Sequence, residues 1–207
     1  MKISDRDITK SNIIYRSAFQ PDIGRILAQF TAQGDNKPRE VLETYLREQE
    51  NGERFVVLAE VDGEAAGYVT LYPEAKDAVP FIRKGIPEIK DLHVFKKFQR
   101  RGIGTRLMDE VENIAAKIAD TVCLGVGLHS GYGTAQRMYV KRGYLFDGSG
   151  AWDGSVPAKP YGMVENGDEL VLFMSKKLRG NRFACTGGAT HALHTNEEEF
   201  VNEEVSM

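Results

Sequence analysis

Residues 91–108 read DLHVFKKFQRRGIGTRLM, and this stretch carries the strongest structural signal in the chain. Its apolar residues up to Phe95 are typical of a strand, and Gly102 and Gly104 open a segment with helical spacing. Glycines at such a junction let the backbone approach a ligand closely, and the free N–H groups of a helix start attract an anion. The loop between strand and helix is basic, with Lys96, Lys97, Arg100 and Arg101. The stretch therefore predicts a site for a phosphate or pyrophosphate.

Two common nucleotide-binding motifs do not fit this stretch. A dinucleotide-binding fingerprint needs a third glycine where Leu107 stands. A P-loop needs the pattern GxxxxGK[ST], which the sequence lacks. On these residues alone, a basic strand-to-helix turn without a ligand stays the remaining alternative.

Hydrophobic periodicity extends a mixed α/β pattern on both sides of the stretch. Asp62-Gly63 predicts a tight hairpin turn, and residues 73–85 and 145–168 are expected to be loops. We expect strands at 13–19, 54–61, 65–72, 86–95, 122–129 and 170–177, with a short one near 144–146. We expect helices starting at Asp22, where the aspartate caps, and at Pro38, and further helices over 102–119 and 134–142. This order predicts an α/β fold.

Length and composition predict one domain followed by a tail. The chain has 207 residues, of which 42% are hydrophobic and 28% charged, enough for a packed core over residues 1–179. Residues 180–207 hold one arginine and five glutamates, so we expect a disordered acidic tail, with a functional acidic segment as the alternative. The rest of the chain is nearly neutral, which argues against nucleic-acid binding.

The sequence also predicts the location and metal content of the protein. No apolar run approaches the roughly 20 residues of a membrane span, and the first residues, MKISDRDITK, lack the apolar block of a signal peptide. We therefore expect a cytoplasmic protein that does not bind membranes. Cys123 and Cys185 do not make a disulfide framework, and His191 and His194 are a weak metal pair, so no metal is expected.

Residues 99–104, QRRGIG, fit the motif Q/R-x-x-G-x-G/A, and here the sequence resembles the GNAT N-acetyltransferase superfamily. The strand EIKDLHV before it and the later YVKRGY of residues 139–144 resemble the family's central strand and its Y-x-K-x-G-F/Y segment. The similarity covers residues 13–178 by order of elements and is strongest over 86–146. One departure is Tyr132, which stands where the family often has asparagine.

The resemblance implies a mostly antiparallel central sheet flanked by helices, with two splayed parallel strands that form a cleft for acetyl-CoA. Those strands would be residues 86–95 and 122–129. The backbone of Leu92, His93 and Val94 would pair with the pantetheine arm. The pyrophosphate would lie on the segment formed by Gln99, Arg100, Arg101, Gly102, Ile103, Gly104 and Thr105.

The same resemblance implies catalytic roles. Tyr139 would donate a proton to the leaving thiolate of CoA, with a packing tyrosine as the alternative. Glu88 would be the general base, with a solvated carboxylate or an ion-pair partner of Lys90 as the alternative. Asp91 and His93, on the same strand, are lesser candidates for the base.

The resemblance also implies that the late loop completes the acceptor pocket, and carboxylates beside aromatic rings would suit a cationic amine there. Its candidates are Trp152, Asp153 and Tyr161, with Asp168 and Glu169 near them, against the alternative of ordinary loop polarity.

We therefore expect an acetyl-CoA-dependent N-acetyltransferase that acts by direct attack of a small-molecule amine. Candidate acceptors are an aminoglycoside- or streptothricin-like antibiotic, a polyamine and an amino-acid derivative. The alternatives are a protein N-terminal or lysine acetyltransferase, and a CoA-binding sensor or interaction module without turnover. The protein is expected to be a monomer or homodimer.

Overall fold

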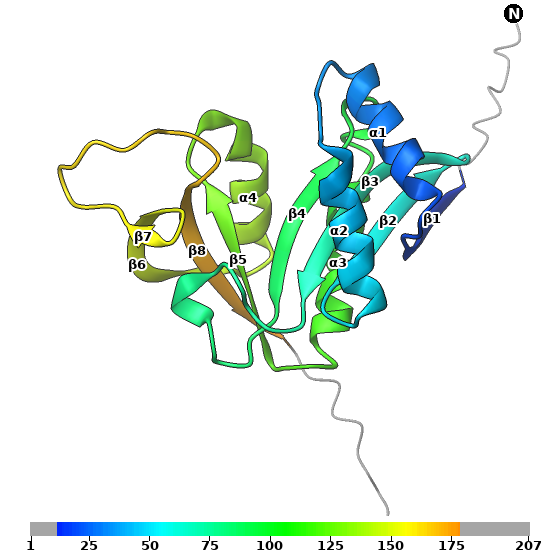
Figure 1. The fold of residues 1–207 in the computed structure, drawn as a ribbon. Helices are drawn as coiled ribbons and strands as arrows, with labels where there is room; N and C mark the ends of the chain where they lie inside the picture. Colours follow the sequence, from blue (N-terminus) through cyan, green and yellow to red (C-terminus); the bar gives the residue numbers. More distant parts are fainter. Residues whose placement is uncertain (1–11, 179–207) are drawn as a thin grey trace, which may run out of the picture.

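The computed structural model describes residues 12–178, and these form one eight-stranded sheet with helices on both faces (Figure 1). The strand order across the sheet is β1-β2-β3-β4-β5-β8-β6-β7. The strands are β1 (Ile13–Ser17), β2 (Phe55–Val61), β3 (Glu64–Tyr72), β4 (Glu88–Val94), β5 (Thr121–Gly127), β6 (Leu145–Asp153), β7 (Val156–Pro157) and β8 (Leu170–Lys177). The helices are α1 (Asp22–Ala32), α2 (Arg39–Glu50), α3 (Ile103–Ala115) and α4 (Gly133–Lys141).

Every neighbouring pair of strands in this sheet is antiparallel except β4 and β5, which are parallel. The predicted mixed, mostly antiparallel sheet with one parallel pair is therefore confirmed. The parallel pair joins two arms. One arm runs from β1 to β4, and the other consists of β5, β8, β6 and β7 (Figure 1).

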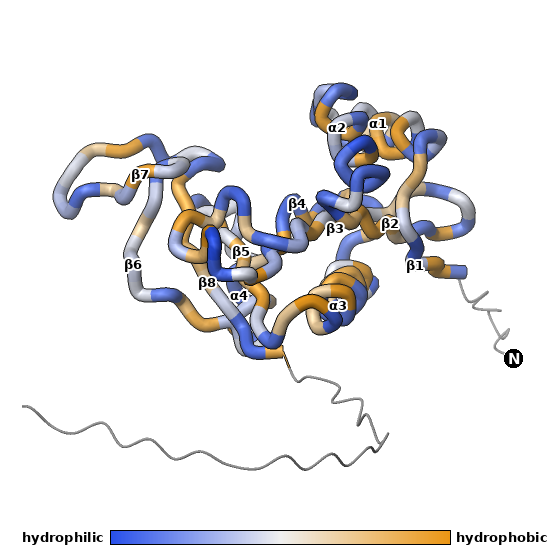
Figure 2. The backbone as a smooth tube through the Cα atoms, turned by 60° about the horizontal axis from the view of Figure 1, so that its bottom comes forward, coloured by the Kyte–Doolittle hydropathy of each residue, from blue (hydrophilic) through white to orange (hydrophobic). Residues whose placement is uncertain are grey.

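The helices divide between the two faces of the sheet. Helices α1 and α2 cover β2 and β3 on one face, and α3 lies on the other (Figure 2). Alternate residues of β3 serve both faces, so this strand is buried almost throughout. Leu107, Met108 and Val111 of α3 are fully buried against the sheet, because they fall on one side at helical spacing.

The expected elements are present with shifted ends, and one expectation is wrong. The sequence predicts mostly loop for residues 145–168, but β6 runs through nine of them and pairs with β8. Gly148 and Gly150 adopt φ values of 85° and 84° inside this strand, where the register shifts between Phe146 and Ala151. A strand interrupted in this way lacks the alternation by which sequence patterns reveal strands.

Two smaller expectations differ from the structure or fall outside it. Asp22 is predicted to cap α1 from outside, but it is the first helical residue, and its Oδ2 accepts the N–H of Phe19 at 3.0 Å. The predicted tail at 180–207 lies outside the described residues, and the single domain over 1–179 stays a prediction. Among the helices of the described part, none has the length and apolar character needed to cross a membrane.

A buried carboxylate ties the two arms together on the α3 face. Glu112 of α3 accepts hydrogen bonds from Arg142 at 2.9 Å, from Lys176 at 2.7 Å and from the Tyr144 hydroxyl at 3.1 Å. These partners follow α4 or lie on β8, so the network fixes the second arm against α3. Burial alone would raise the pKa of Glu112, but the hydrogen bonds from Arg142 and Lys176 outweigh it and lower the pKa.

Glu112→Ala should lower the free energy of unfolding by about 3 kcal/mol at pH 7, because it leaves Arg142 and Lys176 without their shared anion. The folded-state pKa of Glu112 is depressed, so its contribution is complete above the unfolded value of about 4.3 and fades as pH falls below it. Urea unfolding at pH 7 and at lower pH measures both effects. Glu43→Ala, which breaks the exposed Arg39–Glu43 pair, should cost less than about 1 kcal/mol.

Candidate active site

The sheet opens between β4 and β5. Only Glu88 with Cys123 and Ile89 with Leu124 are paired across these strands, and the Cys123 N–H also donates to the Pro87 carbonyl at 2.9 Å. Beyond Ile89 the two strands diverge (Figure 1). The C-terminal part of β4 therefore presents an open edge, which is where the resemblance places the pantetheine arm.

The backbone direction along β4 identifies the groups on that edge. The Phe95 N–H donates to the Ala66 carbonyl at 3.1 Å and so points toward β3. Because successive residues of a strand direct their N–H groups to opposite edges, those of Val94 and Leu92 point toward the cleft. The structure thus gives Leu92 and Val94 the edge predicted for them, whereas the His93 backbone faces β3.

The side chain of His93 lies on the face covered by α1 and α2. Its ring centroid is 4.7 Å from that of Phe30 and 4.9 Å from that of Phe95, and it stacks on Tyr68. Burial lowers the pKa of His93, so the imidazole is neutral at pH 7. This aromatic packing gives the side chain a structural role on that face.

The loop between β4 and α3 presents free backbone donors. Gly102 adopts φ 79° and Arg100 φ 62°, so the chain turns sharply before the helix begins at Ile103. Within the described residues, the N–H groups of residues 101–105 have no backbone or side-chain acceptor, as expected for the first turn of a helix. Such converging N–H groups, with the positive end of α3 behind them, suit an anion.

The side chains of this loop agree with the prediction of an anion site. Gln99 donates through Nε2 to the Val94 carbonyl at 2.9 Å, which ties the loop to the end of β4. Arg100 and Arg101 are exposed, and no ion pair holds either within residues 12–178. All residues predicted for the pyrophosphate thus lie together at one end of the cleft.

Tyr139 of α4 lies on the β5 side, buried to 7% exposure. Its hydroxyl makes no hydrogen bond to any described residue, although its ring packs against Tyr144 with centroids 5.8 Å apart. Burial, and secondarily Tyr132, raises the pKa of Tyr139, so the phenol keeps its proton at neutral pH. A protonated hydroxyl without an internal partner can donate to a ligand.

A second polar cluster lies just after the end of β5. The Tyr132 hydroxyl donates to Asp168 Oδ1 at 3.0 Å, and His129 Nε2 lies 3.0 Å from the same oxygen. His129 Nδ1 accepts the Gly131 N–H at 3.1 Å, so its proton is on Nε2 and points to Asp168. Burial and the bond to Asp168 raise the pKa of Tyr132 to about 12, and the charge of Asp91 adds to this.

The position of the Tyr132 ring explains why residue 127 is a glycine. A Cβ at Gly127 of β5 would lie 2.4 Å from the Tyr132 ring, so only glycine lets the ring lie on the strand. The phenol thus takes a place at the cleft where the family often has the smaller asparagine.

Glu88 has an unexpected set of partners. It is 2% exposed, and its Oε2 accepts the N–H groups of Lys76, Asp77 and Ala78 at 3.0, 2.9 and 3.1 Å. The carboxylate therefore anchors the loop between β3 and β4 beside the last β4–β5 pair. A role for Glu88 as the base stays a prediction.

The predicted acceptor residues separate in the structure. Trp152 packs against Phe173 with centroids 5.8 Å apart, in a second apolar cluster that the β3–β4 loop covers. Asp153 and Glu169 are exposed at the ends of β6 and of the late loop, whereas Tyr161 points fully into solvent. Of these four residues, only Trp152 packs against an apolar cluster.

A polar cluster on the α1–α2 face is not predicted as a site by the sequence. Asp91 accepts hydrogen bonds from Tyr45 of α2, from Tyr68 of β3 and from Lys37, which stands two residues before α2. The apolar spacing of Tyr45 and Tyr68 predicts core positions, which their rings do occupy. Only their contacts across the fold reveal that their hydroxyls serve Asp91.

Comparison with known proteins agrees with this geometry. The model of the "Acetyltransferase (GNAT) family" matches residues 22–144. An uncharacterized N-acetyltransferase from Lactobacillus delbrueckii subsp. lactis is 28% identical over 153 residues, which are 69% of this chain and 82% of the relative. A ribosomal-protein-alanine N-acetyltransferase from Brucella melitensis has a TM-score of 0.58 at 20% identity, covering 80% of this chain and 99% of that one.

The structure of a putative acetyltransferase from Salmonella typhimurium with its cofactor acetyl-CoA has a TM-score of 0.59 at 17% identity. The match covers 86% of this chain and 99% of that one. The chain belongs to the acetyltransferase (GNAT) family. The predictions of the family and of an acetyltransferase are confirmed.

Gly102→Ala should lower the free energy of unfolding by about 1 kcal/mol, because alanine at φ 79° is strained although no atom lies within 4 Å of its Cβ. Gly24→Ala is the matched control, since that site in α1 is equally open and has no positive φ. It should raise the free energy of unfolding by about 0.5–1 kcal/mol. Urea titrations measure both changes in the free energy of unfolding. Opposite signs for the two variants would support the conclusion that residue 102 takes a left-handed conformation which only glycine adopts without strain, and equal signs would contradict it.

Proposed function

We propose that the protein transfers the acetyl group of acetyl-CoA to a primary amine of a small molecule by direct attack. The observation that carries this proposal is the pairing of free N–H groups over residues 101–105 with the open edge of β4 beyond Ile89. The N–H groups of the loop could bind a pyrophosphate, and the open edge of β4, which leads into that loop, could bind the amide-bearing pantetheine arm. CoA carries these two groups next to each other.

The chain offers CoA two kinds of contact. The N–H groups of residues 101–105 would hold the pyrophosphate, with Arg100 or Arg101 adding positive charge. The edge groups of Leu92 and Val94 would pair with the pantetheine amides as if these were an added strand. Both contacts use backbone atoms, so they depend on the shape of the loop and strand more than on side-chain identity.

The reaction needs one proton removed and one supplied. An alkylamine with a pKa of about 10 is mostly protonated at pH 7, so a proton must leave before the nitrogen attacks the thioester carbon. As the C–S bond breaks, the departing thiolate takes a proton. Tyr139 is the proposed donor, supported by its protonated, internally unpartnered hydroxyl.

Glu88 stays a candidate for accepting the proton of the amine, through water, because it lies at the root of the cleft. Its burial and its three backbone donors favour an anchoring role instead. A pH–rate profile of Glu88→Gln distinguishes these roles, since loss of a base is relieved as pH rises, whereas loss of an anchor is not.

The small-molecule acceptor is supported by the loops that border the face where the amine would enter. Residues between β3 and β4 pack over the second apolar cluster, and the late loop is tied to the cleft by Asp168. The second candidate is an acetyltransferase for protein N-termini, favoured by the similarity of the fold to the ribosomal-protein-alanine N-acetyltransferase from Brucella melitensis. We place the activity in the cytoplasm, as the sequence predicts.

Acetyl-CoA should raise the melting temperature of the full chain and release thiol in the presence of an accepted amine. Gly104→Leu should abolish the melting shift, because a large side chain would occupy the first turn of α3, whereas Gly24→Leu should leave it unchanged. Thiol release across a panel of small amines and of peptides with free N-termini separates the two candidate acceptors. A shift with NAD or ATP and none with CoA would refute the proposal.

Tyr139→Phe should lower kcat by about 10²-fold or more, because only the proton donor to the leaving thiolate is lost. The Kd of acetyl-CoA should stay unchanged. Tyr144→Phe is the matched control, since its hydroxyl donates to Glu112 and should affect stability more than turnover. Steady-state kinetics with the best amine from the panel measure both, and full activity of Tyr139→Phe would show that Tyr139 only packs.

A further inference from the structure

Asp91 is the centre of a compact polar cluster on the face covered by α1 and α2. Its Oδ2 accepts the hydroxyls of Tyr45 and Tyr68, each at 3.0 Å, and the ammonium of Lys37. Among the described residues, none donates a hydrogen bond to Oδ1. The carboxylate is 22% exposed, so it is held firmly on one oxygen while the other stays available.

The backbone of β4 is distorted to bring Asp91 to this face. Asp91 adopts φ 50°, and the register with β3 shifts where Tyr68 pairs with His93 and Thr70 with Lys90. A β-bulge of this kind redirects a side chain, and a strained residue of this kind is often found at a functional site. Aspartate tolerates the left-handed region better than most residues, which fits its presence here.

Aromatic rings surround the ammonium that Asp91 binds. Lys37 Nζ lies 5.4 Å from the ring centroid of Tyr68, 5.6 Å from that of Tyr45 and 5.8 Å from that of Phe30. These distances fall within the range of cation–π attraction. Burial and the charge of Asp91 raise the pKa of Tyr45 and of Tyr68, so both hydroxyls stay protonated as donors. The cluster is therefore a built receptor for one ammonium group.

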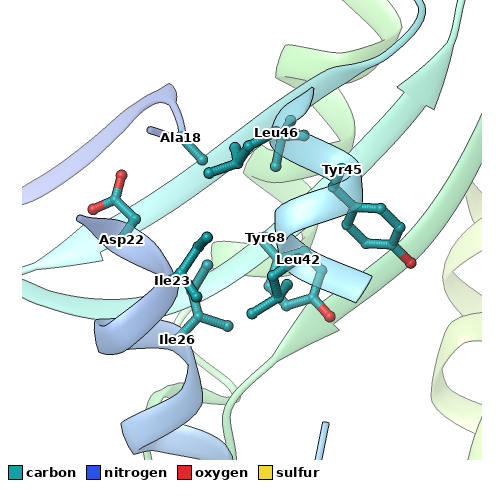
Figure 3. A pocket seen from close by; sticks show the side chains of 9 residues that line it. Ala18, Asp22, Ile23, Ile26, Leu42, Tyr45, Leu46 and Tyr68 are labelled. Carbon is teal, nitrogen blue, oxygen red and sulfur yellow. The ribbon is translucent and has the colours of Figure 1, made fainter. Parts of the chain in front are cut away.

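The apolar void behind the cluster is not part of this receptor. It has a volume of about 10 Å³ and is lined mainly by aliphatic side chains of α1, α2 and β2. Figure 3 shows the Tyr45 oxygen pointing away from these side chains. A void of that size holds at most one water molecule, so the polar side of the two tyrosines is the side that can take a ligand.

Charge balance indicates what the receptor accepts when Lys37 leaves. Arg54, 3% exposed between the rings of Tyr45 and Tyr72, is paired with Glu48 at 2.6 Å. Removal of Lys37 would leave the carboxylate of Asp91 as a partly buried, uncompensated negative charge. Because such a charge is costly, a single positive charge must replace the lysine.

We propose that Asp91, with the rings of Tyr45, Tyr68 and Phe30, binds the protonated amine of the acceptor, and that Lys37 occupies this subsite until the acceptor displaces it. The proposal rests on the proposed function and deepens it, because it names the acceptor as a cation at its reacting end. Asp91 directly precedes Leu92, whose N–H lies on the cleft edge, so an ammonium held there is beside the strand that would hold the thioester arm. Lys37 lies between α1 and α2, outside both helices, so its side chain can leave without unfolding either.

Direct binding tests this subsite without turnover. The probe is N,N-dimethylbutylamine, which is protonated at pH 7, can donate one hydrogen bond and cannot form a stable amide; 1-hexanol is its neutral counterpart. Binding to the full chain with CoA present is followed by NMR in wild type, Lys37→Met, Asp91→Asn and the double variant. Lys177→Met, which breaks the exposed Lys177–Asp120 pair, is the matched control.

Lys37→Met should bind the cationic probe at least fivefold more tightly than wild type, because the internal competitor is gone. Asp91→Asn should remove this gain in affinity in the double variant. Lys177→Met should bind the cationic probe as wild type does, and 1-hexanol should bind to all variants with the same affinity. Equal affinity in wild type and Lys37→Met, or a gain that survives Asp91→Asn, would overturn the proposal. The CoA-induced melting shift is measured on every variant. Its absence from wild type would refute the proposed function, while the comparison of probe affinities would still decide the subsite.

Discussion

The proposed CoA site depends on the short pairing between β4 and β5, which ends at Ile89. On their other edges, β4 pairs with β3 at five residue pairs and β5 pairs with β8 at seven. Between them, only two residue pairs and the Cys123 N–H bond to Pro87 join the arms. A parallel ladder that continued past Ile89 would consume the N–H groups of Leu92 and Val94 and leave no edge for a ligand. The cleft thus costs several backbone hydrogen bonds, and the Glu112 network on the α3 face supplies the contacts that hold the second arm in place.

One strand divides the chemistry between the two faces of the sheet. The end of β4 leads through the basic loop into α3, which lies on one face, while its bulge turns Asp91 to the face of α1 and α2. Without the bulge, strict alternation along the strand would separate Asp91 from Lys90 and from the face on which Tyr45 lies. The extra residue therefore allows a single short strand to keep a free edge, proposed for CoA, and to turn the carboxylate of Asp91 toward α1 and α2.

How well each part could be predicted from the sequence depends on how local its physics is. The turn from β4 into α3 and its free N–H groups could be predicted because a left-handed Gly102 and the donors of a helix start are properties of neighbouring residues. Helices α1 to α4 followed from periodicity for the same reason. Strand β6 was missed because Gly148 and Gly150 break its alternation. The partners of Glu88 are backbone groups of Lys76, Asp77 and Ala78, and those of Asp91 come from three separate elements, so neither environment is encoded in local pattern. Only the folded chain brings these groups together.

The buried Arg54 fixes the position of Tyr45, one of the two tyrosines that donate to Asp91. Its guanidinium lies 4.1 Å from the ring centroid of Tyr45 and 3.9 Å from that of Tyr72, while Thr70 accepts one of its N–H groups at 2.8 Å. A planar cation held between two rings leaves Tyr45 little freedom to rotate, and Glu48 neutralises the charge that would otherwise repel a second cation on that ring. The side chain of Tyr45 therefore loses its conformational freedom when the protein folds, and not when an amine binds. A receptor ordered in this way gains affinity because binding need not restrict it further. It discriminates by charge because, among the described residues, Asp91 has no ion-pair partner other than Lys37.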